Sequence, residues 1–163
     1  MNYLEITKDD LLNGEGVRVT LWVSGCNHHC KNCHNPETWN DKEGKLFDHK
    51  AIQEISNELL KPYIAGVTLT GGDPLYPNNR ETIGDLIKEV KRKFPNKNIW
   101  LWTGYKWNEI KNLPFIKYID VLVDGEFIQD LHSPNLMWRG SSNQNVIDVK
   151  KSLEQDKMVL YCK

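Results

Sequence analysis

The sequence lacks any long apolar run, since no stretch approaches the ~18 residues that a helical membrane span needs. It also lacks an excess of either charge: 21 lysines and arginines face 22 aspartates and glutamates, for a formal net charge of -1. Without a basic surplus, nothing attracts the chain electrostatically to nucleic acid or to an anionic membrane. No basic and apolar leader opens the sequence. We therefore expect a soluble, cytoplasmic protein that binds neither nucleic acid nor membrane.

Internal repeats, low-complexity tracts and linkers rich in Pro, Gly or Ser are also missing, so we expect one domain over residues 1–163. Hydrophobic residues make up 39% of the chain and charged residues 26%, as in ordinary globular proteins. A chain of this length can bury a hydrophobic core without help from disulfides.

A regular alternation of strand and helix patterns is present. Apolar residues recur at helical spacing over 48–60, behind Asp48 as a helix N-cap, and over 79–94, where Pro95 ends the pattern. The other predicted elements are strands over 17–23, 66–70, 99–102 and 118–123, a short helix over 107–111, a weaker strand near Val146, a short helix around Ser152 and a final strand over 158–161. Such alternation predicts parallel strand pairing.

Unusual loop residues follow four of the predicted strands. The segments are Ser24-Gly25-Cys26, Gly71-Gly72-Asp73-Pro74, Thr103-Gly104-Tyr105 and Asp124-Gly125-Glu126-Phe127. Because parallel α/β folds build their sites at the carboxyl ends of strands, we expect these loops to form one site. The chain is short for an eight-unit barrel of ~250 residues. The predicted fold is therefore an open, partial (β/α) barrel with a mostly parallel sheet.

Cysteine is scarce, but three of the four cysteines lie within eight residues, at Cys26, Cys30 and Cys33. Thiols this crowded make no obvious disulfide, and clustered thiols in a reducing compartment are more often metal ligands or redox groups. The C-x3-C-x2-C spacing lets three thiolates hold three irons of a four-iron cluster. With no fourth cysteine nearby, one iron stays open, unlike the clusters of ferredoxins, which four cysteines usually close.

A structural zinc site is the alternative, because a neighbouring histidine can complete a tetrahedral ligand set. His28, His29 and His34 are the candidates. The second, more distant ligand pair that zinc sites usually have is missing. Cys162 lies far along the chain, and we expect it to play no part in the site.

The cysteine spacing after a first strand resembles the signature of the radical-SAM superfamily. The resemblance implies a [4Fe–4S] cluster held by Cys26, Cys30 and Cys33, whose open iron binds S-adenosyl-L-methionine. Reduction then gives methionine and a 5′-deoxyadenosyl radical that abstracts a hydrogen atom. The Gly71-Gly72-Asp73 segment resembles the superfamily's GGE segment, which contacts the methionyl amino group. Aspartate here stands where glutamate is commoner.

Other site residues follow from the same resemblance. Asp124 and Thr103, each at a strand end, are candidates to contact the cofactor. Asp124 could do so through a ribose hydroxyl, and the alternative is that Asp124 only forms a plain Asp-Gly turn. Asn32 departs from the superfamily, which often has an aromatic residue there against the adenine. Hydrogen-atom transfer moves proton and electron together, so we expect no catalytic acid or base, and the cofactors supply the chemistry.

The segments 122–127 and 136–144, together with 13–18 and 102–105, resemble the anaerobic ribonucleotide reductase activating proteins, although Glu126 stands where proline is expected. The resemblance implies that the substrate is a glycine in the large subunit of anaerobic ribonucleoside-triphosphate reductase, which becomes a glycyl radical. An external electron donor is implied as a second partner. The alternatives are a radical-SAM enzyme that activates another glycyl-radical enzyme or acts on a small molecule, and a zinc-binding interaction module.

Overall fold

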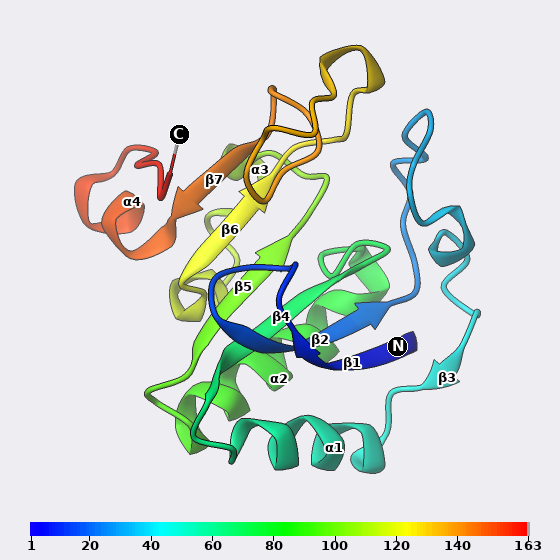
Figure 1. The fold of residues 1–163 in the computed structure, drawn as a ribbon, viewed down its shortest axis with the longest axis vertical. Coiled ribbons are helices and arrows are strands. Elements are labelled where there is room, and N and C mark those ends of the chain that lie inside the picture. The colour runs from blue at the N-terminus through cyan, green and yellow to red at the C-terminus, as the bar shows by residue number, and fades with distance from the viewer. Residues whose placement is uncertain (163) are drawn as a thin grey trace.

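A computed structural model describes residues 1–162 as a mixed α/β fold on one seven-stranded sheet (Figure 1). Lys163, the last residue of the domain predicted over 1–163, lies outside the described residues. The strands are β1 (Asn2–Asp10), β2 (Val17–Val23), β3 (Lys45–Leu46), β4 (Ile64–Gly71), β5 (Asn98–Trp102), β6 (Val121–Asp124) and β7 (Asn145–Asp148). The α-helices are α1 (His49–Leu59), α2 (Arg80–Lys93), α3 (Trp107–Ile110) and α4 (Val149–Gln155), and 3-10 turns cover Pro36–Thr38, Pro77–Asn79, Ile116–Tyr118 and Gln129–Leu131. Within residues 1–162, every helix is too short or too polar to cross a membrane.

The sheet has the strand order β3-β1-β2-β4-β5-β6-β7. Its centre, from β2 through β4 and β5 to β6, is parallel, as the strand–helix alternation predicts. The prediction of a mostly parallel sheet is wrong at both edges, where β1, β3 and β7 pair antiparallel. Only residues 11–16 separate β1 from β2, and so short a connection can join antiparallel strands but not parallel ones.

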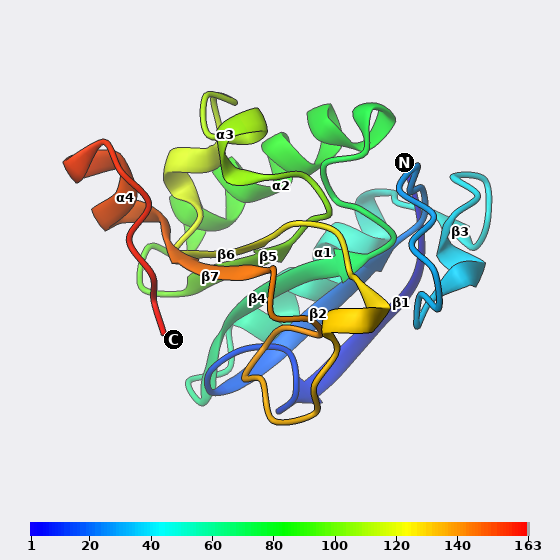
Figure 2. The ribbon, with the colours of Figure 1, turned by 90° about the horizontal axis from the view of Figure 1, so that it is seen from above.

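The main core lies between the sheet and the helices. Side chains alternate along β2, so Val19, Leu21 and Val23 are buried with Ile55 of α1 and Ile87 of α2. Figure 2 shows α2, α3 and α4 on one side of the sheet, with the 11–16 connection and the long β6–β7 loop on the other. The helices therefore leave the second face of the sheet to loops.

Both long helices form where the sequence predicts them. α1 begins after Asp48, whose side chain accepts a hydrogen bond from the Ala51 N–H at 3.1 Å, so the predicted N-cap is confirmed. α2 ends just before Phe94, ahead of Pro95. These boundaries depend on local signals, namely a cap and a proline, that the sequence displays directly.

Three features differ from the sequence expectations. β1 and β3 were not predicted, and β6 starts at Val121 because residues Ile116–Tyr118 form a 3-10 turn. The strand predicted over 158–161 is wrong: the described tail makes a single bridge, between Ile147 and Leu160, along the free side of β7.

The second face of the sheet carries a smaller apolar cluster and a buried cation. Trp100 is buried with Val121, Val123 and Val146, and Trp138 packs edge-on against it at 4.8 Å between ring centroids. Arg18 is fully buried beside this cluster, with its guanidinium 5.4 Å from the Trp100 ring centroid. Loops thus complete a second, partly polar core.

Candidate functional site

Four loops meet at the carboxyl ends of the parallel strands and line one hollow of about 170 Å³, here called the cysteine hollow. It takes Cys26, Cys30 and Cys33 from the loop after β2, and glycines and Asp73 from the end of β4. The β5 and β6 ends contribute further walls, including Thr103 and Glu126. Segments far apart in the sequence thus converge because parallel strands end at the same edge.

The three thiols are free, half-buried and arranged on a loop with tight local turns. The backbone of His29 has φ 50° and that of Asn32 has φ 59°, both left-handed, and the Cys33 N–H donates to the Cys30 carbonyl at 3.1 Å. Asparagine tolerates left-handed geometry better than most residues, which gives Asn32 a backbone role in the loop.

Burial raises the pKa of the Cys26 thiol to about 11 and also raises the pKa of Cys30. Both thiols therefore keep their protons at neutral pH, and metal binding has to displace them. Among residues 1–162, no three His, Cys, Asp or Glu side chains converge on one ion position. A four-iron cluster needs no such convergence, because each thiolate binds a different iron. The donor set in the hollow fits a cluster of this kind.

The loop histidines, which a zinc site would recruit, are engaged elsewhere. His28 contacts two carboxylates, described below, and His29 stacks on Trp39 with ring centroids 4.4 Å apart and an interplanar angle of 17°. His34 lies against Phe127 at 5.4 Å between ring centroids. None of these contacts directs a ring nitrogen to a sulfur.

Gly71 and Gly72 allow the end of β4 to approach the end of β2 closely. Gly71 has φ 112°, and a Cβ there would lie 2.5 Å from the Val23 nitrogen. A Cβ on Gly72 would lie 2.6 Å from the Gly25 carbonyl oxygen. The Asp73 N–H donates to that same oxygen at 2.7 Å. The glycine pair therefore brings Asp73 beside the cysteine loop.

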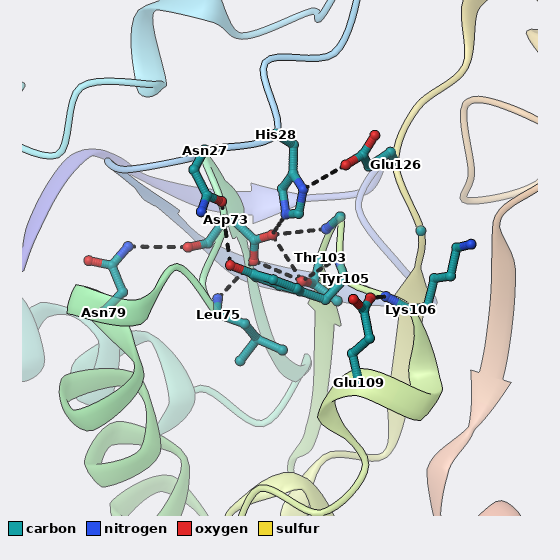
Figure 3. A network of polar contacts seen from close by, with 12 residues as sticks. Asn27, His28, Asp73, Leu75, Asn79, Thr103, Tyr105, Lys106, Glu109 and Glu126 are labelled. Atoms are coloured by element: carbon teal, nitrogen blue, oxygen red, sulfur yellow. Dashed lines mark hydrogen bonds and ion pairs between the residues drawn. The ribbon is translucent and has the colours of Figure 1, made fainter.

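The Asp73 carboxylate is 1% exposed and accepts hydrogen bonds from four groups, as Figure 3 shows. Three come from the protein frame: the Leu75 N–H at 2.8 Å, the Thr103 hydroxyl at 2.8 and 3.0 Å, and the Gly104 N–H at 2.9 Å. The fourth is His28 Nε2 at 2.8 Å. A ligand ammonium group would have to share this carboxylate, and His28 is the only donor of the four that an exposed loop supplies.

His28 is a site residue that the sequence alone does not reveal: from the sequence it is a candidate zinc ligand and more readily a polar loop residue. Its Nε2 faces Asp73, and its Nδ1 faces the Glu126 carboxylate at 3.0 Å. The hydrogen bond to Asp73 raises the pKa of His28, which favours the protonated ring, in which both nitrogens are donors. These partners lie 45 and 98 positions away in the sequence, where no local pattern reveals them.

Thr103 and Asp124 occupy different places. Thr103 lines the cysteine hollow and donates its hydroxyl to Asp73. Asp124, buried at the end of β6, lines a neighbouring hollow of about 760 Å³ instead, here called the outer hollow. Its carboxylate accepts from the Trp107 N–H at 2.9 Å and from Asn145 at 3.0 and 2.9 Å. A contact from Asp124 to a ribose remains a prediction.

Comparison with known proteins places these residues in a family context. Residues 12–147 match the family described as "4Fe-4S single cluster domain". A protein of Enterobacteria phage T4 is 51% identical over 146 residues, covering 90% of this chain and 93% of the relative. A Haemophilus influenzae protein is 50% identical over 148 residues (88% and 96%), and one from Escherichia coli K12 is 45% identical over 150 residues (90% and 97%). Each of these relatives is named "Anaerobic ribonucleoside-triphosphate reductase-activating protein".

Proposed function

The chain belongs to the 4Fe-4S single cluster domain family and to the anaerobic ribonucleoside-triphosphate reductase-activating proteins, and we propose that it activates that reductase by radical-SAM chemistry. The observation that carries this proposal is the cysteine hollow. Three free thiols line it, and the Gly71-Gly72-Asp73 segment lies at its wall. That combination suits a cluster with one open iron beside a carboxylate.

Cys26, Cys30 and Cys33 would hold three irons, and Gly71, Gly72 and Asp73 would contact S-adenosyl-L-methionine, with Thr103 and Asp124 as further contacts. When bound, the reduced cluster would supply one electron, splitting this cofactor into methionine and a 5′-deoxyadenosyl radical that takes an α-hydrogen from a glycine of the large reductase subunit. The partner then carries a glycyl radical, and 5′-deoxyadenosine is released. The electron comes from an external donor.

The chain's own residues position and shield rather than transfer protons. Thr103 and the Gly104 and Leu75 N–H groups fix the Asp73 carboxylate in a buried place at the wall of the hollow. The three thiols themselves are half-buried, which limits the access of water to the sulfur atoms. We propose no catalytic acid or base, because hydrogen-atom transfer needs none.

We further propose that the sheet is the partial, open barrel of the radical-SAM type, in one domain. The parallel centre and the convergence of its strand ends on the cysteine hollow support this. We also propose a cytoplasmic location, where reducing conditions keep clustered thiols available as ligands.

The test starts with the full chain reconstituted anaerobically with iron and sulfide. It should hold about four iron atoms per chain and cleave S-adenosyl-L-methionine once reduced. Changing Cys26, Cys30 or Cys33 singly to Ala should abolish cleavage, whereas Cys162→Ala, the matched control, should leave it intact. Cleavage that survives Cys30→Ala would contradict the assignment.

Partner specificity needs its own experiment. The reduced protein is incubated with the large subunit of an anaerobic ribonucleotide reductase and, separately, with another glycyl-radical enzyme. A glycyl signal in electron spin resonance should appear only on the reductase. A signal only on the other enzyme would show that the activated partner is a different one, and one tightly bound zinc without iron would favour an interaction module.

A further inference from the structure

His28 links the cysteine loop to three strand ends at once. It lies between Cys26 and Cys30, and its ring reaches Asp73 after β4 and Glu126 after β6 (Figure 3). The same ring packs edge-on against Tyr105 after β5, with centroids 4.7 Å apart. Its side chain is only 10% exposed although its loop neighbours Asn27 and His29 are exposed. Because this side chain contacts all three strand ends, it fixes the position of the neighbouring thiols relative to those strands.

Gly104 provides the space that the imidazole ring fills. A Cβ at this position would lie 2.4 Å from His28 Cδ2 and 2.6 Å from Nε2, and the nearest atoms that it would meet all belong to His28. Gly104 is not among the glycines with positive φ, so the obstacle that an alanine there meets first is the His28 ring rather than the backbone conformation. The absence of a side chain at Gly104 is therefore matched to the ring of His28.

The ring also separates two cavities. His28, Gly104, Gly125 and Glu126 line both the cysteine hollow and the outer hollow. On its other side the cysteine loop is held by the Cys26 N–H, which donates to the Trp39 carbonyl at 3.1 Å, and by the stacking of His29 on Trp39. Without His28, the loop would keep its attachment to residue 39 and lose the two hydrogen bonds that the ring makes to Asp73 and Glu126 at the strand ends.

We propose that His28 is a positioning residue that fastens the cysteine loop to the ends of β4, β5 and β6 and fixes the Asp73 carboxylate against that loop. The inference rests on the proposed function only in naming what the loop and the carboxylate bind. It predicts that loss of the ring frees the thiol-bearing loop in the metal-free protein, before any cofactor is present.

The first experiment measures mobility of the loop in the full chain without metal. Lys31 is exposed within the loop, and trypsin cutting after it is followed by mass spectrometry, with the cut after exposed Lys42 as internal reference. His28→Ala should raise the relative cutting rate about tenfold or more, because hydrogen bonds to charged groups restrain local opening by at least that factor. His28→Gln, which keeps one amide donor, should restore part of the protection. His49→Gln, an exposed histidine on α1, should change nothing.

The second experiment uses Gly104→Ala, which should displace the ring and reproduce the effect of His28→Ala. In the double variant the two changes should not add, because both act through one contact. In the reconstituted protein, His28→Ala should raise KM for S-adenosyl-L-methionine by a larger factor than it lowers kcat, since Asp73 loses its orientation rather than its chemistry.

Failure of the inference has distinct signatures. A cutting rate in His28→Ala within about twofold of the parent, against the tenfold expected from lost charged hydrogen bonds, would overturn it. Additive effects of the two substitutions would do the same, because Gly104 would then act independently of the ring. If the parent cleaves no S-adenosyl-L-methionine, the proposed function fails, while the trypsin comparison on metal-free protein still decides the role of His28.

Discussion

Arg18 shows how one residue can organise the face of the sheet that the helices leave uncovered. Its guanidinium is fully buried and donates to Thr68 Oγ1 at 2.7 Å, to Asn98 Oδ1 at 2.7 Å and to backbone carbonyls, including that of Val67 at 2.9 Å. Burial lowers its pKa to about 10, well above neutral pH, so the side chain stays charged. It binds the start of β2 to β4 and β5 through acceptors that lose this donor when the side chain is removed.

Arg18→Ala should therefore destabilise the fold by about 3 kcal/mol or more, because several buried acceptors lose their partner together. Urea unfolding followed by circular dichroism measures the loss. Arg92→Ala, on the exposed last turn of α2, is the control and should stay within about 0.5 kcal/mol of the parent. An Arg18 variant as stable as the control would mean that water replaces the arginine at no cost.

At the scale of elements, the connection between β1 and β2 is held by Asp10. Its buried carboxylate accepts hydrogen bonds from the Thr20 hydroxyl at 2.6 Å, the Leu12 N–H at 2.8 Å and the Asn13 amide at 2.7 Å. Burial acts to raise the pKa of Asp10, but these hydrogen bonds outweigh it and hold the pKa below the ordinary 3.8. The ionised form is thus the one that the folded loop prefers.

A carboxylate with a lowered pKa adds stability that is complete above pH 3.8 and is lost as the pH falls through its folded value. Asp10→Asn should cost about 1 to 3 kcal/mol at neutral pH. The difference between parent and variant should shrink below pH 3.8. Urea unfolding across this range tests both statements, with Asn at exposed Asp9 as control. A constant difference at all pH values would show that Asp10 contributes by shape alone.

The elements that the sequence predicts best are those with local signals. α1 has an N-cap at Asp48, α2 is followed by Pro95, and both helices show helical periodicity. The buried central strands are short apolar runs. β1 could not be recognised in the same way, because its burial pattern is irregular and bulges interrupt its register with β2. Its strand conformation comes from pairing, a tertiary effect that local propensity does not contain.

At the scale of the whole molecule, strand order decides which residues meet. The sequence predicts that the loops after β2, β4, β5 and β6 share one edge, and the structure brings them to the cysteine hollow. The sequence does not predict that His28 lies between Asp73 and Glu126, or that Gly104 makes room for the His28 ring. Those contacts depend on side-chain positions within the assembled fold, beyond what strand order alone specifies.

The longest-range link joins the tail to the β1–β2 connection. The Tyr161 hydroxyl donates to the Glu15 carboxylate, 146 positions away, and the Tyr161 N–H donates to the Val146 carbonyl at 2.8 Å. The Tyr161 ring packs edge-on against Trp100 at 5.3 Å between centroids. The tail therefore covers the smaller apolar cluster without forming a strand of its own.

The hydrogen bond to Glu15 raises the pKa of Tyr161 from 10.0 to about 12. A group whose pKa is raised on folding adds stability that is complete below the unfolded value and is lost as pH rises through the folded one. Tyr161→Phe should therefore lower the free energy of unfolding by about 1 kcal/mol at neutral pH. The deficit should fade between pH 10 and 12, where the parent's hydroxyl ionises against Glu15. Urea unfolding at neutral pH and at pH 12 measures the difference in stability between Tyr161→Phe and the parent. Tyr118→Phe is the control. Equal stability of Tyr161→Phe and parent at neutral pH would mean that the tail is held by its backbone and ring alone.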